Sequence, residues 1–503
     1  MYTNTKIRSL PGIKRDGTRL EGDHYIDGQW CRFQRGLPRK MGGYLSISQN
    51  LPEKVYGIHS FSANARQYIH LGSESELNQR VVNNSGAVTG ENDRTPAGLV
   101  ASANNIWQFD ALFEVNAGGT VLVAHAAPNM DIDQTTDFDI FSGLITDSAI
   151  LTTSGQDPVS GGVLVVGNYL VGFGSGGYVQ WSDQNDLSST LDAGNFTQQK
   201  IIAGRRIRGG GIPAAVLWSL DSLLLMTFNP NPAVSSPIFD FDTLTDDTSI
   251  LASRGIMEYD GVFYWAGVDR FLMYNGVVRE VPNQFNVNFF YDNLNFEQRQ
   301  KVFAYKVPRF GEIWWCYPHG DATECNRAVV LNVREGYWYD TVLPDEGRTD
   351  GLYAKVYFKP FMTGAEEDGG EFDLWQHETG MDRVRGGDTQ PIPSHFETAE
   401  ISLATQDNAV DKALSVAVIE PDFVQSGDLE LTIRGRANSR TSIRDSSQKT
   451  IPESASTPDE QIVRLKEHRR LMSFKFGSNT LGGDYQAGES LAHIQPDDGR
   501  ITE

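Results

Sequence analysis

Residues 255–281 read GIMEYDGVFYWAGVDRFLMYNGVVREV. This segment holds four short apolar runs, each of about the length of a β-strand, and turn sequences separate them. The turns are Asp260-Gly261, residues 267–269 and Asn275-Gly276. Asp-Gly and Asn-Gly accept positive φ, which tight hairpin turns need in order to match the twist of their strands. The segment therefore predicts a compact antiparallel meander of four strands.

The same pattern recurs along the chain with different residues. Six or seven such units lie between about residue 55 and residue 383, at spacings of roughly 40–60 residues. A single meander is apolar on both faces and cannot bury both alone, so neighbouring meanders must stack. Radial stacking leaves only short, protected edges, and this predicts a β-propeller. A sandwich of the same strands in Greek-key order is the alternative that the sequence leaves open.

The chain divides into three predicted parts. Residues 1–50 form an N-terminal arm and platform segment, residues 51–390 form the propeller, and residues 391–503 form a smaller C-terminal β platform domain. A short helical insert is expected in the propeller near 286–301, where Asn295 and Gln298 have the spacing of a capping box. Within the C-terminal part, the polar, Ser-rich stretch near 438–460 is expected to be a mobile loop, and the residues after Asn479 are expected to be an extended tail. The predicted class is all-β.

The charge of the chain limits its partners. Lys and Arg number 43 against 65 Asp and Glu, a net charge of −22, and such a surface repels nucleic acid and anionic membranes. The first 40 residues are the exception, with nine Lys or Arg against four acids. They form either a solvated polar arm or an arm that docks on an acidic partner. Three cysteines are too few for a disulfide framework, and no apolar run is long enough for a signal peptide or a membrane span, so synthesis in a cytoplasm is expected.

No motif in the sequence predicts catalysis, a cofactor or a metal ion. GFGSGG at 172–177 matches a dinucleotide fingerprint, but the YVQWSD that follows has the pattern of a strand, whereas the fingerprint must open a helix. Cys316, His319 and Cys325 supply three ligands at unusual spacing, which favours an ordinary hairpin loop. The basic cluster Arg205, Arg206 and Arg208 is interpreted as charge at a strand edge or at a subunit interface rather than as a DNA contact.

Several segments together resemble a known family. These are residues 250–276, the amphipathic FNVNFFYDNLNFEQRQKVFAYKVPRFGEIWWCYP at 285–318, RAVVLNVREGYWYDTVLP at 327–344, HRRLMSFKF at 468–476 and YIDGQWCRFQRGLPRKMGGY at 25–44. Their order is similar to that in the tail hub or nozzle proteins of short-tailed bacteriophages (podoviruses), a family that includes the packaged-DNA stabilisation protein.

The resemblance implies a structural virion protein and not an enzyme. Six copies would form a homohexameric ring below the portal and its adaptor ring, would retain the packaged DNA and would form the channel for its ejection. Further implied partners are tail fibres or tailspikes, a tail needle or plug, and double-stranded DNA that passes without sequence-specific binding. The protein would be assembled in the host cytoplasm and would reside in the virion tail.

Two sets of residues are candidate contacts in such an assembly. The set expected to dock the adaptor is Lys14, Arg15, Arg32, Arg35, Arg39 and Lys40. The set expected to contact the neighbouring subunit is Phe289, Phe290, Tyr291, Phe296 and Arg299. The alternative function is that of a secreted β-propeller, either a glycan-binding protein or a glycoside hydrolase or lyase, although no paired carboxylates are evident.

Overall fold

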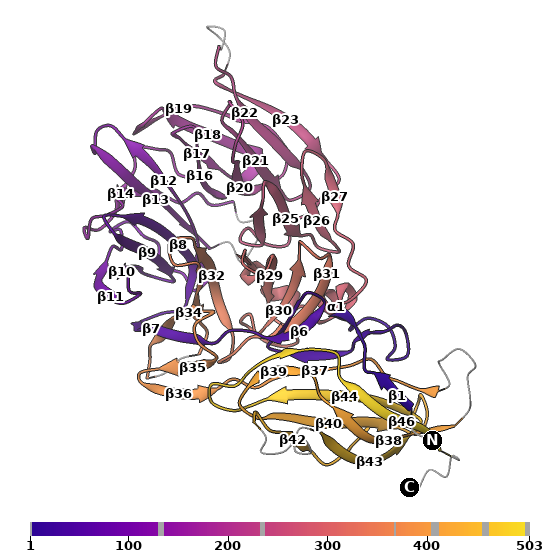
Figure 1. Cartoon of the computed structure of the whole chain (residues 1–503). Coiled ribbons are helices and arrows are strands. Elements are labelled where there is room, and N and C mark those ends of the chain that lie inside the picture. Colours follow the sequence, from indigo (N-terminus) through magenta and orange to yellow (C-terminus); the bar gives the residue numbers. More distant parts are fainter. Residues whose placement is uncertain are drawn as a thin grey trace.

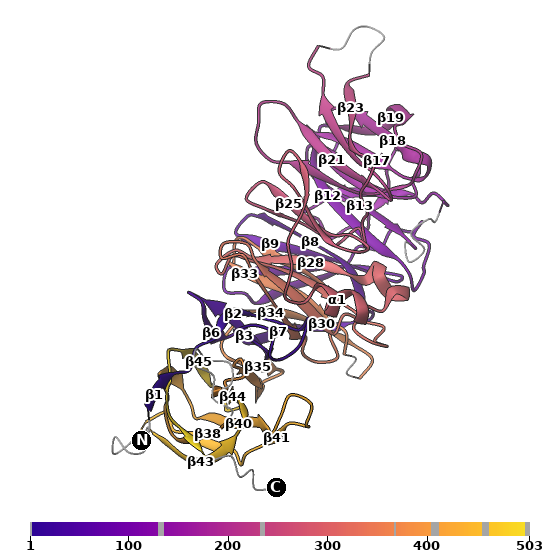
Figure 2. The same ribbon diagram turned by 90° about the vertical axis from the view of Figure 1, so that its right-hand side faces the viewer.

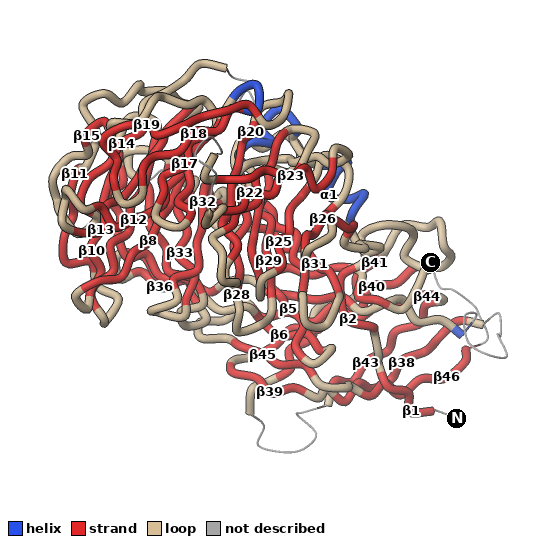
Figure 3. The backbone as a smooth tube through the Cα atoms, turned by 90° about the horizontal axis from the view of Figure 1, so that it is seen from above, coloured by secondary structure: helices blue, strands red, loops and turns tan. Residues whose placement is uncertain are grey.

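A computed structural model describes residues 3–128, 135–231, 237–366, 369–403, 412–454 and 462–497. Strands dominate it, and the few helical turns lie at its edges (Figure 3). The chain forms two parts, a large wheel of sheets and a smaller platform that carries both termini (Figures 1 and 2). Residues 455–460 of the predicted mobile loop and the last six residues of the predicted tail lie outside the described ranges.

Six of the sheets are consecutive four-stranded meanders, here named blades 1 to 6. Blade 1 is β8 (Val55–Ala63), β9 (Arg66–Ser73), β10 (Leu77–Asn83) and β11 (Val88–Asp93). Blade 2 is β12 (Ile106–Glu114), β13 (Gly119–Ala127), β14 (Ile140–Leu144) and β15 (Thr152–Thr153). Blade 3 is β16 (Gly162–Val166), β17 (Tyr169–Phe173), the 3-10 turn η1 (Ser175–Gly177), β18 (Tyr178–Asp183) and β19 (Asp186–Asn195).

Blades 4 to 6 continue the same order. Blade 4 is β20 (Ile201–Ile207), β21 (Ala214–Ser219), β22 (Leu223–Phe228) and β23 (Phe239–Thr245). Blade 5 is β24 (Ile256–Tyr259), β25 (Val262–Ala266), β26 (Phe271–Tyr274) and β27 (Val278–Glu280). The helix α1 (Val287–Asn293) and the 3-10 helix η2 (Phe296–Lys301) then precede blade 6, which is β28 (Phe303–Val307), β29 (Glu312–Tyr317), β30 (Arg327–Asn332) and β31 (Tyr337–Val342).

The seventh blade joins the two ends of the wheel. Its strands β32 (Arg348–Ala354), β33 (Lys359–Gly364) and β34 (Phe372–His377) lie in this order, and β34 pairs with β7 (Tyr44–Leu51). The same sheet continues through β35 (Asp382–Arg385) and β36 (Asp388–Pro391). The innermost strand β32 also lies beside β8 of blade 1. The described residues thus form a closed propeller of seven blades. This confirms the predicted β-propeller and excludes the sandwich, because the meanders close into a ring instead of facing each other in two layers.

Local sequence accounts for the meanders. In blade 5, Tyr259 pairs with Val262 across the turn Asp260-Gly261, where both turn residues have positive φ, 50° and 83°. These are the φ signs of a type I′ turn, which matches the strand twist. Between blades 4 and 5, the rings of Trp218 and Trp265 meet edge to face at 5.6 Å. Buried aromatic pairs of this kind hold neighbouring blades together.

In the part of the chain that the structure describes, the platform contains three main sheets and one small one. The first is β1 (Thr3–Lys6), β46 (Leu491–Asp497), β38 (Ala413–Glu420) and β43 (Val463–Arg469). The second is β4 (Asp27–Gln29), β37 (Ser394–Glu397), β44 (Leu471–Ser478) and β40 (Leu429–Arg436), with β41 (Arg444–Asp445) and β42 (Lys449–Ile451) both paired to β40. The third is β39 (Phe423–Ser426), β45 (Asp484–Ala487), β6 (Leu37–Lys40) and β5 (Cys31–Gln34), and the fourth pairs β2 (Leu10–Ile13) with β3 (His24–Tyr25).

The structure corrects three details of the sequence-based expectations. Residues 44–51 belong to blade 7 as β7, so the arm ends before residue 50. The residues after Asn479 are not simply a tail, because β46 lies between β1 and β38 within a sheet. The helical insert predicted near 286–301 is confirmed as α1 and η2, but the capping box is not: Asn295 precedes η2 without a side-chain cap. The helix α1 begins at Val287, where the Asp16 carboxylate of the N-terminal arm accepts the N–H groups of Asn288 and Phe289.

One buried histidine predicts how acid affects stability. His125 on β13 is fully buried, its Nε2 lies 2.9 Å from the Val159 carbonyl oxygen, and burial lowers its pKa from 6.5 to about 4. The unfolded state binds the proton more readily than the folded state does. The contribution of neutral His125 to the folding free energy is therefore complete above about pH 6.5 and is lost as the pH falls towards 4. We expect the loss to reach about 3 kcal/mol. In urea unfolding between pH 7.5 and pH 4.5, His125→Gln should lose less stability than the wild type, and an identical loss would contradict the assignment.

Candidate functional site

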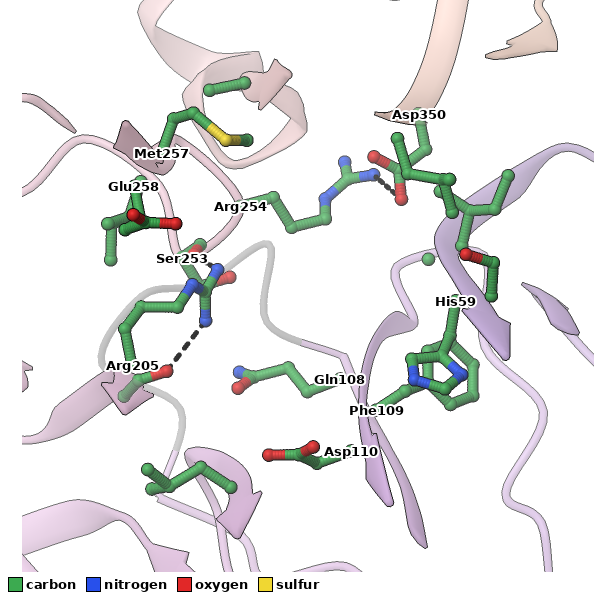
Figure 4. A pocket seen from close by; sticks show the side chains of 18 of the residues that line it. His59, Gln108, Phe109, Asp110, Arg205, Ser253, Arg254, Met257, Glu258 and Asp350 are labelled. Atoms are coloured by element: carbon green, nitrogen blue, oxygen red, sulfur yellow. Dashed lines mark hydrogen bonds and ion pairs between the residues drawn. The ribbon is translucent and has the colours of Figure 1, made fainter. Parts of the chain in front are cut away.

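A cavity of about 470 Å³ occupies the centre of the propeller. Residues from the innermost strands of all seven blades line it, so the ring closure itself creates the site. Arg208 and Lys355 are exposed and lie just beyond the C-terminal ends of β20 and β32, whereas Ser253 and Arg254 are buried. The cavity thus opens to solvent at the C-terminal ends of β20 and β32. Figure 4 shows Arg205 and Gln108 reaching towards its centre from different sides.

The acidic residues of the cavity already have partners. The Asp110 carboxylate accepts the N–H groups of Ala111 and Val165, both at 2.8 Å. Asp350 lies 3.3 Å from the Arg254 guanidinium, and burial raises the pKa of this carboxyl despite the opposing effect of Arg254. Glu258 lies 3.3 Å from the Lys306 ammonium. Each carboxylate therefore already has a hydrogen-bond or ion-pair partner within the protein.

Most of the basic residues of the cavity lack such carboxylate partners. The Arg205 guanidinium donates to the carbonyl oxygens of Gly204 and Ser253, at 2.9 and 3.1 Å, and has no carboxylate at ion-pair distance among the described residues. Burial lowers the pKa of Arg205, although Asp110 and Asp350 act in the opposite direction. Arg206, Arg208 and Lys355 also line the cavity, and none of the three makes an ion pair with another described residue. Six cations against three acids make the cavity basic within an acidic protein.

Four polar atoms of the cavity lining are buried without a hydrogen-bond partner among the described residues. They are Gln108 Oε1, Ser253 Oγ, Arg254 Nε and His59 Nδ1. Burial lowers the pKa of His59 to about 4, so this imidazole is neutral at pH 7. Unsatisfied buried polar atoms cost free energy. All four belong to residues that line the cavity, and a lining with a few placed polar groups is typical of ligand sites.

The structure does not bring the six predicted docking residues together on one surface. Arg32 and Lys40 are each only 1% exposed, so the prediction that they dock an adaptor is wrong for these two residues. Arg32 pairs with Glu312 and Glu378, and Lys40 donates to the Gly483 carbonyl oxygen. In a sequence, a positive charge usually indicates a surface position. Here the charges of Arg32 and Lys40 instead satisfy carboxylate and carbonyl acceptors inside the protein.

The other four docking residues have varied surroundings. Arg15 is largely buried and pairs with Asp27 and Asp340, so it ties the arm to blade 6. Lys14 lies 3.3 Å from Glu21, and Arg39 donates to Gln34. Arg35 is exposed at positive φ in the turn between β5 and β6.

The predicted subunit-contact residues divide in a similar way. Phe290 is fully buried and packs against Phe271 and Tyr317, so it serves the core of the wheel. Tyr291 donates to the Gly267 carbonyl oxygen, and Phe289 lies beneath the guanidinium groups of Arg15 and Arg327. Only Phe296 presents a large exposed apolar surface, 48% exposed, and the Arg299 guanidinium lies 4.3 Å from its ring centre.

The cavity was not evident from the sequence as a site. Arg205, Arg206 and Arg208 stood out as a basic cluster, but Gln108, Ser253 and Arg254 carry no motif. Gln108 comes from blade 2, and Ser253 and Arg254 come from the connection between blades 4 and 5, so only the closed ring brings them together. The strand predicted for YVQWSD is confirmed as β18, and Cys316 and Cys325 are buried free thiols.

Comparison with known proteins gives little beyond the fold. No family model matches the chain, and no curated protein matches it. Similar solved structures include the crystal structure of the mitotic checkpoint complex, at 11% identity and a TM-score of 0.40, over 67% of this chain and 95% of that chain. The WD40 β-propeller domain of Doa1 is similar at 8% identity and a TM-score of 0.39, over 66% of this chain and 97% of that one. At these values neither similarity supports a functional argument. Among the described residues, no helix has the length and apolar character to cross a membrane.

Proposed function

We propose that this chain is a structural virion protein, the tail nozzle or hub subunit of a short-tailed bacteriophage. Six copies form a ring below the portal and adaptor, retain the packaged DNA and line its exit. The observation that carries the proposal is the joining of a closed propeller to a platform made from both chain termini, in a chain whose segments at 250–318, 327–344 and 468–476 resemble that family.

The junction between the two parts fits a subunit that has to withstand mechanical force. One continuous apolar core runs from the platform, through Trp30 and Phe33, into Tyr305 and Trp314 of blade 6. Arg15 and Arg32 add ion pairs to Asp340 and Glu312 of the same blade. A subunit that holds DNA under pressure needs domains that do not move apart, and large apolar interfaces between domains resist such motion.

The charge of the chain also supports the proposal. Six copies, each with a net charge of −22, form a strongly acidic assembly. DNA carries about one negative charge per 1.7 Å of its axis, so acidic walls do not bind it tightly. Low adhesion would let the duplex leave quickly.

Native mass spectrometry of the purified chain tests the assembly. A particle of six times the 55.7 kDa chain mass supports the nozzle. A monomer that neither forms a ring nor binds isolated portal–adaptor complexes would overturn it. Truncation of residues 1–40 is not a clean test of docking, because it removes buried Tyr25, Trp30 and Phe33 from the core that both parts share.

Phe296 offers a test of the ring contact by a single substitution. Because the side chain is exposed and stacked under Arg299, Phe296→Ala should leave the fold intact and weaken association about tenfold per interface. Mass photometry over a dilution series measures the loss of hexamers. Phe358→Ala is the matched control, since Phe358 is 78% exposed and lies in blade 7, away from the helical insert. Equal hexamer stability in both variants would reject the insert as the contact.

A further inference from the structure

We propose that the central cavity of the propeller binds a small sugar that carries an oxyanion, such as a uronic acid or a sugar phosphate. The inference does not depend on the tail function, because it rests only on residues that line the cavity of a single chain. It would hold for any assembly that leaves the cavity open.

The charge of the cavity selects an anion. Asp350 and Glu258 pair with Arg254 and Lys306, and Asp110 offsets only part of the charge that Arg205, Arg206, Arg208 and Lys355 bring to the cavity. Arg205 donates only to main-chain carbonyl oxygens and keeps further N–H groups for a ligand. A guanidinium pairs with a carboxylate or a phosphate through two parallel hydrogen bonds, which makes Arg205 the expected anchor.

The buried polar atoms favour a ligand that also carries hydroxyl groups. Ser253 is 4% exposed, Arg254 is 8% exposed and Gln108 is 9% exposed, and each has one buried polar atom without a protein partner. The Gln108 amide nitrogen donates to the carbonyl oxygens of Gly161 and Ile202, which fixes the orientation of the amide. Its Oε1, as an amide oxygen, can only accept a hydrogen bond. Ser253 Oγ can donate or accept, and Arg254 Nε donates. A sugar brings several hydroxyl groups, each a donor and an acceptor, to these side chains, whereas inorganic phosphate brings mostly acceptors.

The size and the apolar lining of the cavity fit a sugar as well. A volume of about 470 Å³ lies within the range of small-molecule sites, about 300–1,000 Å³. Phe109, Met257 and Leu352 supply apolar surface beside the polar groups. Such surface can cover the C–H face of a sugar ring while the polar groups bind its hydroxyls.

Isothermal titration calorimetry at low salt on the full chain tests the proposal with four probes. Glucuronate and glucose 6-phosphate are expected to bind saturably, and glucose and inorganic phosphate at least tenfold more weakly. The stronger of the two acidic sugars identifies which oxyanion the site takes. Glucose binding as tightly as the acidic sugars would overturn the role of the oxyanion. Phosphate binding as tightly as the acidic sugars would mean an adventitious ion only, and no binding by any probe would also overturn the proposal.

Three variants locate the binding in the cavity. Arg205→Gln should weaken the binding of glucuronate or glucose 6-phosphate at least tenfold, because it removes the guanidinium group that pairs with the oxyanion. Ser253→Ala should weaken them several-fold and leave folding intact, because the lost hydroxyl has no protein partner. Arg66→Gln, an exposed arginine on β9 of blade 1 outside the cavity, is the matched control and should change nothing. Unchanged affinity in the first two variants, with their circular dichroism preserved, would place the binding elsewhere and overturn the assignment.

Discussion

Replacing Arg32 by alanine is expected to cost about 3–5 kcal/mol of folding free energy, because it leaves a carboxylate buried and unpaired. Arg32 from β5 of the platform meets Glu312 of blade 6 with a distance of 2.9 Å between Nε and Oε1. Glu312 is fully buried, and burial raises its pKa even though Arg32 opposes this. Tyr339 and Trp314 donate to the same carboxylate, so its position is set by the core. Urea unfolding at pH 7 measures the effect.

The control for Arg32 lies three residues away. Arg35→Ala removes an exposed arginine from the same hairpin and is expected to change stability by less than about 0.5 kcal/mol. Arg32→Met combined with Glu312→Gln should lose less than Arg32→Met alone, since the double variant leaves no charge unpaired at Glu312. Equal losses for Arg32→Ala and Arg35→Ala would contradict the role of this pair at the junction.

Trp107→Ala is expected to cost about 3–5 kcal/mol, the range for deleting a buried aromatic side chain. Trp107 on β12 is 2% exposed, and its indole N–H donates to the Ser73 carbonyl oxygen of blade 1 at 2.7 Å. A Cβ added at Gly72 would lie 2.3 Å from the indole ring, so Gly72→Ala must displace it and should cost about 1–3 kcal/mol. The two residues together fix how blade 2 packs on blade 1.

A double-mutant cycle tests this packing. Gly72→Ala with Trp107→Ala should cost clearly less than the sum of the two single changes, because the added methyl group no longer meets the ring. Gly90→Ala is the matched control, since it lies on a strand of the same blade and its added Cβ would be 3.5 Å from Val81, an ordinary contact. Additive losses in the urea midpoints would mean that the two positions do not touch in solution.

Several features of the fold followed from short-range patterns. The apolar runs and the Asp260-Gly261 turn predicted the meander of blade 5, and its hairpin has the expected register and positive φ values. The helical insert lies where the sequence predicts it, but the N-terminus of α1 is capped by Asp16, some 270 positions away in the sequence, and not by a local capping box. The recurring units predict six or seven blades, and the described residues form seven, the last of which takes β7 from the N-terminal region.

The candidate site could be predicted only in part. The basic cluster at 205–208 is visible in the sequence, yet its meaning depends on whether carboxylates lie nearby in space. Arg205 and Arg32 are the same residue type, so the sequence does not tell their roles apart. In the structure, Arg32 contacts Glu312 and Glu378, 280 and 346 positions away, while Arg205 contacts only carbonyl oxygens. Burial and pairing are properties of the packed chain.

Sequence alone determined the all-β class and the repeated four-stranded unit, because strand period and turn geometry depend on neighbours within a few residues. Tertiary structure decided that seven units close through a strand from the N-terminal region, that Arg32 and Lys40 become internal, and that one cavity gathers unpaired polar atoms. The physical reason is that closing a long loop costs little more than closing a short one. Distant segments can therefore compete for the same place, and the packing and charge pairing of the whole chain select between them.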